Sequence, residues 1–192
     1  MVRKLLLVTD FSYKPTLTGK LVVLRCLDEG DFPMMKAAMD DPEVTRLTGS
    51  HEEISDERAR EWLRTRKEQT DRLDLAIVDR STGDAVGEAV LNEYDPDNRS
   101  CNFRILIGPA GRNRGLGTEA TKLIVGYGFE ELGLHRISLD VFAFNPRAQR
   151  AYEKAGFVVE GRLRDALCWK GEWIDSIVMA ILEDEWRART EA

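Results

Sequence analysis

The chain has 192 residues, 43% of them hydrophobic and 32% charged, which is typical of one folded globular domain and excludes a disordered chain. Its formal net charge is −6 and its isoelectric point is about 5.1. This charge disfavours a general nucleic-acid-binding protein, because neutralising phosphates requires clustered lysine and arginine. We therefore expect residues 1–192 to form a single domain, with residues 1–19 as an N-terminal extension.

The cysteines and histidines form no pattern that is typical of a disulfide framework or a metal site. The three cysteines are Cys26, Cys101 and Cys168. They are odd in number and widely spaced, which favours reduced thiols in the cytoplasm. His51 and His135 have no ligand-like neighbours in the sequence, so we expect no metal. The apolar run 5–8 is too short for a signal-peptide core or a membrane span.

Hydrophobic periodicity and turn residues divide the chain into strands and helices. The expected strands are 20–26, 73–79, 85–92, 100–107, 136–142, 157–163 and 174–182. The expected helices are 32–39 after a cap at Asp31, 56–69 after a cap at Ser55, 118–131 and 146–155. Helices and strands interleaved in this order predict one α/β domain with a mixed sheet.

A glycine- and arginine-rich loop, Gly108–Thr118, connects the strand 100–107 to the helix that follows it. Glycines let backbone N–H groups converge on one point without a Cβ in the way. The start of the helix adds its own free N–H groups and the positive end of its dipole. Because Arg112 and Arg114 can add charge at the rim, the loop predicts a cradle for an anion such as pyrophosphate.

Two other interpretations of the loop remain open from its residues alone. The segment Gly115–Ala120 matches the loose dinucleotide fingerprint G-x-G-x-x-[G/A], which in a Rossmann fold directly follows a buried parallel strand. A seven-residue loop between Ile107 and Gly115 disfavours that interpretation here. The second alternative is an ordinary surface loop with solvated arginines.

The loop belongs to a longer pattern of residues downstream. The pattern comprises Arg112-x-x-Gly115-x-Gly117, Asn145-Pro-Arg-Ala148, Tyr152-Glu-Lys-Ala-Gly-Phe157 and Gly171-Glu-Trp-Ile-Asp175. In order and spacing it resembles the GCN5-related N-acetyltransferase (GNAT) superfamily over roughly residues 21–186. Within that superfamily, the chain is similar to the ribosomal-protein N-terminal (RimJ/RimL-like) and spermidine acetyltransferases.

The resemblance implies a fold and a reaction. The implied fold is a mixed, mostly antiparallel sheet of six to seven strands flanked by helices, splayed between the strands that end at Ile107 and Phe142. The implied cosubstrate is acetyl-CoA, whose thioester is attacked directly by a primary amine, either a protein N-terminal α-amine or a small amine such as a polyamine. The resemblance is also compatible with a homodimer. The cysteines, the net charge and the lack of a long apolar run indicate a cytoplasmic protein with no nucleic-acid or membrane partner.

The resemblance also implies roles for the residues that match the superfamily pattern. Backbone groups of the strand end and of the loop would bind pantetheine and pyrophosphate, respectively. Asn145 would also hold the pantetheine, and Tyr152 would protonate the leaving thiolate, which a phenol does only when it is well positioned. The implied coenzyme-binding residues are Ile105, Leu106, Ile107, Arg112, Asn113, Arg114, Gly115, Leu116, Gly117, Thr118, Asn145 and Ala148. Taken alone, Asn145 is better explained as the cap of the helix at Pro146, and Tyr152 as a core aromatic residue.

The residues do not identify a base for the amine. Many relatives carry an acid near the position of Asn102, whereas this chain has asparagine there and Arg104 two residues later. The remaining candidates are Glu88, Asp140, Asp175, His51 or a chain of water molecules.

The acceptor pocket is expected between the segments 32–49, 51–54 and 164–173. Trp169 and Trp173 are candidates for an aromatic wall around an amine; half-buried tryptophans of a connecting loop are the alternative. Two other functions stay open, namely a non-catalytic acyl-CoA-binding regulator and a partner-binding module that has lost the coenzyme. The intact residues Asn145 and Tyr152 disfavour the first, and the intact loop disfavours the second.

Overall fold

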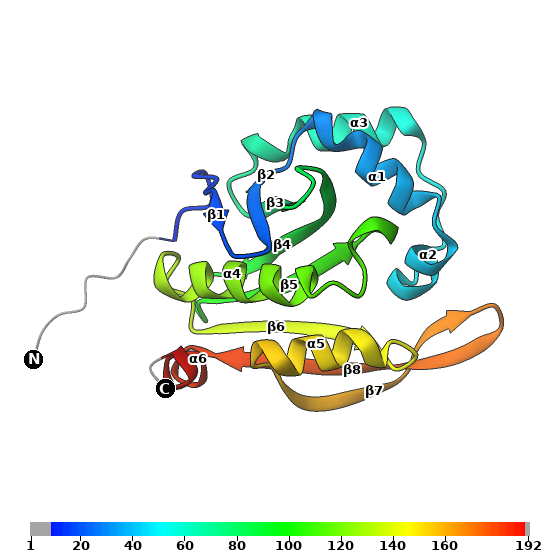
Figure 1. Cartoon of the computed structure of the whole chain (residues 1–192). Coiled ribbons are helices and arrows are strands. Elements are labelled where there is room, and N and C mark those ends of the chain that lie inside the picture. Colours follow the sequence, from blue (N-terminus) through cyan, green and yellow to red (C-terminus); the bar gives the residue numbers. More distant parts are fainter. Residues whose placement is uncertain (1–8, 191–192) are drawn as a thin grey trace, which may run out of the picture.

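The computed structural model describes residues 9–190 as an eight-stranded sheet with helices on both faces (Figure 1). The strands are β1 (Leu17–Thr18), β2 (Val22–Cys26), β3 (Leu73–Asp79), β4 (Ala85–Asp95), β5 (Ser100–Ile107), β6 (Arg136–Phe142), β7 (Val158–Trp169) and β8 (Glu172–Leu182). They lie in the order β1-β2-β3-β4-β5-β6-β8-β7. Only the pairing of β5 with β6 is parallel among these described strands.

Six α-helices accompany the described strands. They are α1 (Phe32–Met39), α2 (Pro42–Thr48), α3 (Asp56–Arg64), α4 (Leu116–Glu130), α5 (Pro146–Ala155) and α6 (Glu183–Thr190). Short 3-10 turns occur at η1 (Glu29–Asp31), η2 (Arg66–Glu68) and η3 (Pro109–Gly111). In Figure 1, α4 and α5 lie side by side in front of the sheet, while α1 and α3 cover the other face of the β2–β4 half.

The two faces of the central strands differ in polarity. Leu75, Leu91 and Phe103 are buried with the apolar residues of α4 in the main core. Ala76, on the opposite face of β3, packs with Phe32 and the other apolar residues of α1 and α3 in a second core. Side chains alternate between the two faces along a strand. The polar residues of β3–β5 are in phase with Ala76 in this alternation, so they lie on the α1–α3 face.

The sheet opens between β5 and β6. These strands pair at three positions, and the last pair joins Asn102 to Ser138. Beyond that point β5 remains paired with β4 as far as Ile107, and β6 remains paired with β8 as far as Phe142. The expected splay between the strands that end at Ile107 and Phe142 is therefore confirmed.

Two elements differ from the sequence-based expectation near the start of the chain. The sequence ends a helix at Asp41-Pro42, and the structure starts a further helix there, because the Asp41 carboxylate accepts hydrogen bonds from the N–H groups of Glu43 (2.7 Å) and Val44 (3.3 Å). The helix expected to reach residue 69 leaves α geometry after Arg64 and continues as the 3-10 turn η2.

The N-terminal extension is partly built into the domain. Phe11 is buried in the main core, and Lys14 Nζ donates to the carbonyl oxygens of Phe11, Gln69 and Arg72 at 2.7–2.8 Å. The short strand β1 adds one strand to the seven that were expected. The apolar run 5–8 lies outside the described residues.

The segment 164–173, expected to be a loop, is the end of a long hairpin. β7 continues to Trp169 and β8 begins at Glu172, so the hairpin projects beyond the body of the sheet (Figure 1). The turn residues Lys170 and Gly171 both have positive φ angles, 50° and 86°. This geometry matches the right-handed twist of two paired strands, which explains why the pairing runs to the tip.

Candidate functional site

A cavity of about 520 Å³ occupies the opening between β5 and β6. Its walls are the end of β5, the start of α4, the end of β6, one side of α5 and the side of α2. Of the residues singled out from the sequence, the cavity brings together Asn102, Arg104, Ile105, Leu106, Ile107, Arg112, Asn113, Gly115, Gly117, Thr118, Asp140, Asn145, Ala148 and Tyr152. This volume suits a ligand of the size of a cofactor.

The start of α4 presents free backbone donors to this cavity. No side chain of the described residues caps the helix, and its N-cap Gly115 has a φ of 79°. Gly117 lies against the preceding strand, since a Cβ there would meet Ile107 Cγ1 at 3.3 Å. Uncapped N–H groups, the helix dipole and a close glycine backbone make this terminus an anion site.

The two loop arginines are engaged with carboxylates. Arg112 lines the cavity, and its guanidinium forms ion pairs with Asp41 (2.9 Å) and Glu43 (2.8 Å) at the start of α2. The Arg114 side chain lies elsewhere, paired with Asp79 and bonded to Ser81 Oγ (3.1 Å) in the β3–β4 turn. Both arginines therefore brace the loop against distant segments, which the sequence alone did not indicate.

The end of β5 offers backbone groups on the side that faces β6. Ile105, Leu106 and Ile107 all line the cavity, and their strand has no pairing with β6 beyond Asn102. Leu116 is different, because its side chain is buried in the main core with 3% exposed. It can contribute to the site only through its backbone.

Asn145 is the N-cap of α5. Its Oδ1 accepts a hydrogen bond from the N–H of Ala148 at 3.1 Å, so the capping alternative is what the structure contains. Asn145 also lines the cavity, and its Nδ2 makes no hydrogen bond to another of the residues 9–190. The cap fixes the side chain at the cavity wall while leaving its amide donors available.

Tyr152 lies in the cavity wall with 9% of its surface exposed. Its ring makes an edge contact with Phe103, at 6.2 Å between centroids, and packs against Phe157 at 6.0 Å. Burial, and then the negative charge of Asp140, raise the pKa of the Tyr152 phenol well above its usual value of about 10. The phenol therefore carries its proton at neutral pH, and it can pass this proton to a thiolate only when the two groups are well positioned.

Glu88 is the most deeply buried of the candidate bases. It is 5% exposed, its Oε1 lies 3.4 Å from the Arg104 guanidinium, and its buried Oε2 has no hydrogen-bond partner. Burial raises the pKa of Glu88, the nearby Asp74 raises it further, and the positive charge of Arg104 opposes the shift. Arg104 itself lines the cavity.

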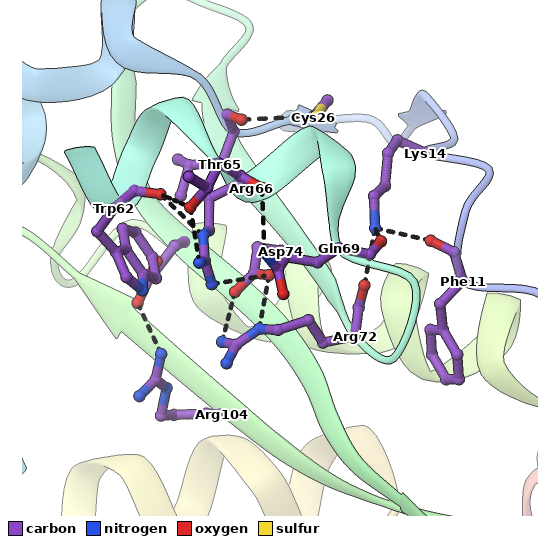
Figure 2. Close-up of polar contacts among 12 residues, drawn as sticks. Phe11, Lys14, Cys26, Trp62, Thr65, Arg66, Gln69, Arg72, Asp74 and Arg104 are labelled. Atoms are coloured by element: carbon purple, nitrogen blue, oxygen red, sulfur yellow. Dashed lines mark hydrogen bonds and ion pairs between the residues drawn. The ribbon is translucent and has the colours of Figure 1, made fainter. Parts of the chain in front are cut away.

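The charged neighbours of Glu88 are Asp74, Arg72 and Arg66, and these three residues form an ion network on the α1–α3 face (Figure 2). Arg72 makes two hydrogen bonds to the Asp74 carboxylate, at 2.6 and 2.8 Å, and Arg66 lies 3.8 Å from the same group. Arg66 is held in turn by the Trp62 carbonyl oxygen (2.9 Å). Asp74 is thereby fully paired by the two arginines, which leaves Glu88 with Arg104 as its one salt-bridge partner among the described residues.

The other candidate bases have structural partners. Asp140 lines the cavity and accepts a hydrogen bond from Ser176 Oγ at 2.9 Å. Asp175 lies in the β7–β8 hairpin, where it pairs with Arg162 and accepts from the N–H of Asp165. These bonds lower the pKa of Asp175, so it is a poor proton acceptor.

The expected acceptor wall forms in part. Val44, Leu47 and Thr48 of α2 line the cavity opposite the strand ends. Beyond them, the ring of His51 packs on Trp169 of the hairpin at 5.4 Å between centroids. Trp173 does not join this contact, and 65% of its surface is exposed.

Sequence comparison identifies the family of this fold and cavity. A sequence model of the acetyltransferase (GNAT) domain matches residues 22–158. The chain belongs to the GNAT acetyltransferase family. The members of this family use acetyl-CoA, and the matched range contains the cavity residues on β5, α4, β6 and α5.

Individual relatives of this GNAT chain are named as N-acetyltransferases. Spermidine N(1)-acetyltransferase of Escherichia coli (strain K12) is 33% identical over 118 residues, which cover 62% of this chain and 63% of that enzyme. The uncharacterized N-acetyltransferase YoaA of Bacillus subtilis (strain 168) is 28% identical over 172 residues, which cover 88% of this chain and 97% of that protein.

A solved structure supports the same assignment. Spermidine N-acetyltransferase from Vibrio cholerae, in complex with CoA and spermine, superposes with a TM-score of 0.80 at 25% identity. The superposition covers 88% of this chain and 99% of that one. In residues 9–190, no helix is long and apolar enough to cross a membrane.

Proposed function

We propose that this chain transfers the acetyl group of acetyl-CoA to a primary amine. The observation that carries the proposal is the cavity, which an uncapped helix start, a strand end without a partner on the β6 side and a buried phenol all face. The helix start suits a pyrophosphate, the strand end suits the amide groups of pantetheine, and the phenol suits a leaving thiolate. Membership of the GNAT family supports the same reaction.

The proposed reaction is direct attack of the amine nitrogen on the thioester carbonyl. The C–N bond forms as the C–S bond breaks, and the thiolate takes a proton from Tyr152. The ammonium substrate loses two protons in all; one replaces the proton given by Tyr152, and the other is released. Backbone groups of Ile105–Ile107 and Arg112–Thr118, with Asn145 and Ala148, hold the coenzyme.

For the released proton we propose Glu88 as the acceptor. A carboxylate whose pKa is raised by burial accepts a proton from an amine more readily than an exposed carboxylate does, because its pKa lies closer to that of the amine. Its neighbour Arg104 reaches the cavity and is about half exposed, so its guanidinium can leave Glu88 when a cationic amine enters. Water carries the proton across the space that Arg104 vacates.

The acceptor is a protein N-terminal α-amine, as in the RimJ/RimL-like group, or a small amine such as a polyamine. The spermidine acetyltransferases among the relatives support the small amine. A cytoplasmic location and a homodimer belong to the same proposal, and sedimentation of the purified protein tests the dimer.

The test is thiol release from acetyl-CoA with a panel of acceptors: N-terminal peptides, polyamines, aminoglycosides and free amino acids. We expect release with at least one class, which then names the acceptor. Calorimetric binding of acetyl-CoA without release across the panel would favour the alternative, a non-catalytic acyl-CoA-binding regulator. Absence of both binding and release would contradict the proposal.

A further inference from the structure

The cavity continues past the phosphate-binding loop into the groove between α4 and α5. The two helices follow parallel strands, so they begin at the same edge of the sheet and run side by side (Figure 1). Thr118 and Thr121 line the groove from α4, and Ala151 and Lys154 line it from α5. A ligand held at the start of α4 therefore has room to extend along α5.

Most of the cationic side chains around the cavity are already neutralised. Arg112 pairs with Asp41 and Glu43, and Arg147 at the start of α5 pairs with Glu43 as well (2.8 Å). Arg104 is the partner of Glu88. None of these arginines offers an uncompensated charge to a phosphate.

Arg150 and Lys154 are the exception. Both line the cavity from α5, and neither forms a hydrogen bond or an ion pair with any of the residues 9–190. Residues four apart share one face of a helix, and two like charges in this arrangement destabilise it. An anion placed between them removes that repulsion.

We propose that Arg150 and Lys154 bind the 3′-phosphate of coenzyme A, an inference that rests on the proposed function. This group is a phosphomonoester with a charge of about −1.5 to −2 at neutral pH, and it sits on the ribose next to the pyrophosphate. With its pyrophosphate at the α4 terminus, the coenzyme would have its ribose within reach of the groove that α5 borders, because both line one cavity. The guanidinium fork and the ammonium then bind the phosphate oxygens by charge-assisted hydrogen bonds. The protein thus discriminates coenzyme A from 3′-dephospho-coenzyme A.

Calorimetric titration with these two molecules tests the inference without any acceptor amine. We expect the unmodified protein to bind coenzyme A roughly tenfold more tightly than the dephospho form. In the double variant Arg150→Gln/Lys154→Gln, binding of coenzyme A should weaken to the level of the dephospho form, whose own affinity stays unchanged. The preference of the unmodified protein should also shrink as salt is added.

Lys67→Gln is the matched control, because Lys67 is exposed on η2 and does not line the cavity; it should keep the full preference. Equal binding of both molecules by the unmodified protein would overturn this inference and leave the proposed function standing. A preference that survives in the double variant would overturn it too. Failure to bind either molecule would overturn the proposed function and this inference together.

Discussion

The helices α4 and α5 begin beside each other at one edge of the sheet, yet their first turns are built differently. α4 starts at Gly115 with no side-chain cap, whereas α5 starts at Asn145, whose side chain caps it. The uncapped terminus leaves backbone donors for an anion. At the capped terminus Asn145 already takes the N–H of Ala148, and α5 contributes side chains to the cavity.

The difference separates binding through backbone groups from the contributions of side chains. The α4 side binds through backbone groups, which glycines bring close to a ligand. The α5 side places Tyr152, and with it the proton that the leaving thiolate needs, on a helix whose start is fixed by hydrogen bonding. Substitutions on the α4 side should therefore change affinity, and those at Tyr152 should change turnover.

The largest effect is expected for Gly115→Glu, which puts a carboxylate against the pyrophosphate. We expect acetyl-CoA affinity to fall by more than about 100-fold, since two like charges then meet in a partly desolvated site; calorimetry measures this loss. Gly83→Glu is the matched control, because Gly83 has nearly the same φ (81° against 79°) in an open turn with no atoms near its Cβ position. Retained affinity in Gly115→Glu would contradict the assignment of the α4 terminus.

On the α5 side, Tyr152→Phe should reduce kcat by about 100-fold while leaving the Kd of acetyl-CoA nearly unchanged, because only the proton donor is lost. Steady-state kinetics and calorimetry on the same preparation separate the two quantities. Full turnover over a broad pH range would show that Tyr152 is not the proton donor.

Glu88 lies on neither helix. Its substitution removes the proposed proton acceptor and should leave the affinity for acetyl-CoA unchanged. Because the pKa of Glu88 is raised, its carboxylate fraction, and with it kcat, should increase as the pH rises through that value. Glu88→Gln should lose this acid limb and about tenfold or more of kcat at neutral pH.

A pH profile of kcat for both proteins checks the prediction. Glu93→Gln, an exposed position on the same strand, should keep the profile of the unmodified protein. An unaltered acid limb in Glu88→Gln would exclude Glu88 as the proton acceptor.

The smallest effect is expected for Asn145→Ala, which removes the cap that distinguishes the two termini. The free energy of unfolding should fall by about 1 kcal/mol, and acetyl-CoA affinity should fall a few-fold as the side chain leaves the cavity wall. Ser55→Ala removes the corresponding cap of α3 and should lower stability without changing affinity. Urea unfolding and calorimetry on both variants test this pairing; equal affinities would restrict Asn145 to capping.

Apart from α2, the strands and helices around the cavity were predictable from the sequence because their signals are local. Alternating apolar residues mark β5 and β6, and the glycines between residues 108 and 117 mark the loop. Asn145 and Tyr152 were found because their spacing after a strand forms part of a family pattern. The α2 helix was missed because Asp41-Pro42 ends one helix and caps the next, and its residues alone do not separate these two uses.

The partners of the charged side chains required the tertiary structure. Arg112 meets Glu43 across 69 positions of sequence, and Arg114 meets Asp79 in another turn. Glu88 becomes a buried acid through the helices α1 and α3 that cover its face. The sequence by itself determined which segments fold locally and which residues can bind or donate protons. Only the tertiary structure decided which charges are neutralised and where the sheet opens, because ion pairing and strand separation depend on residues that are distant in the chain.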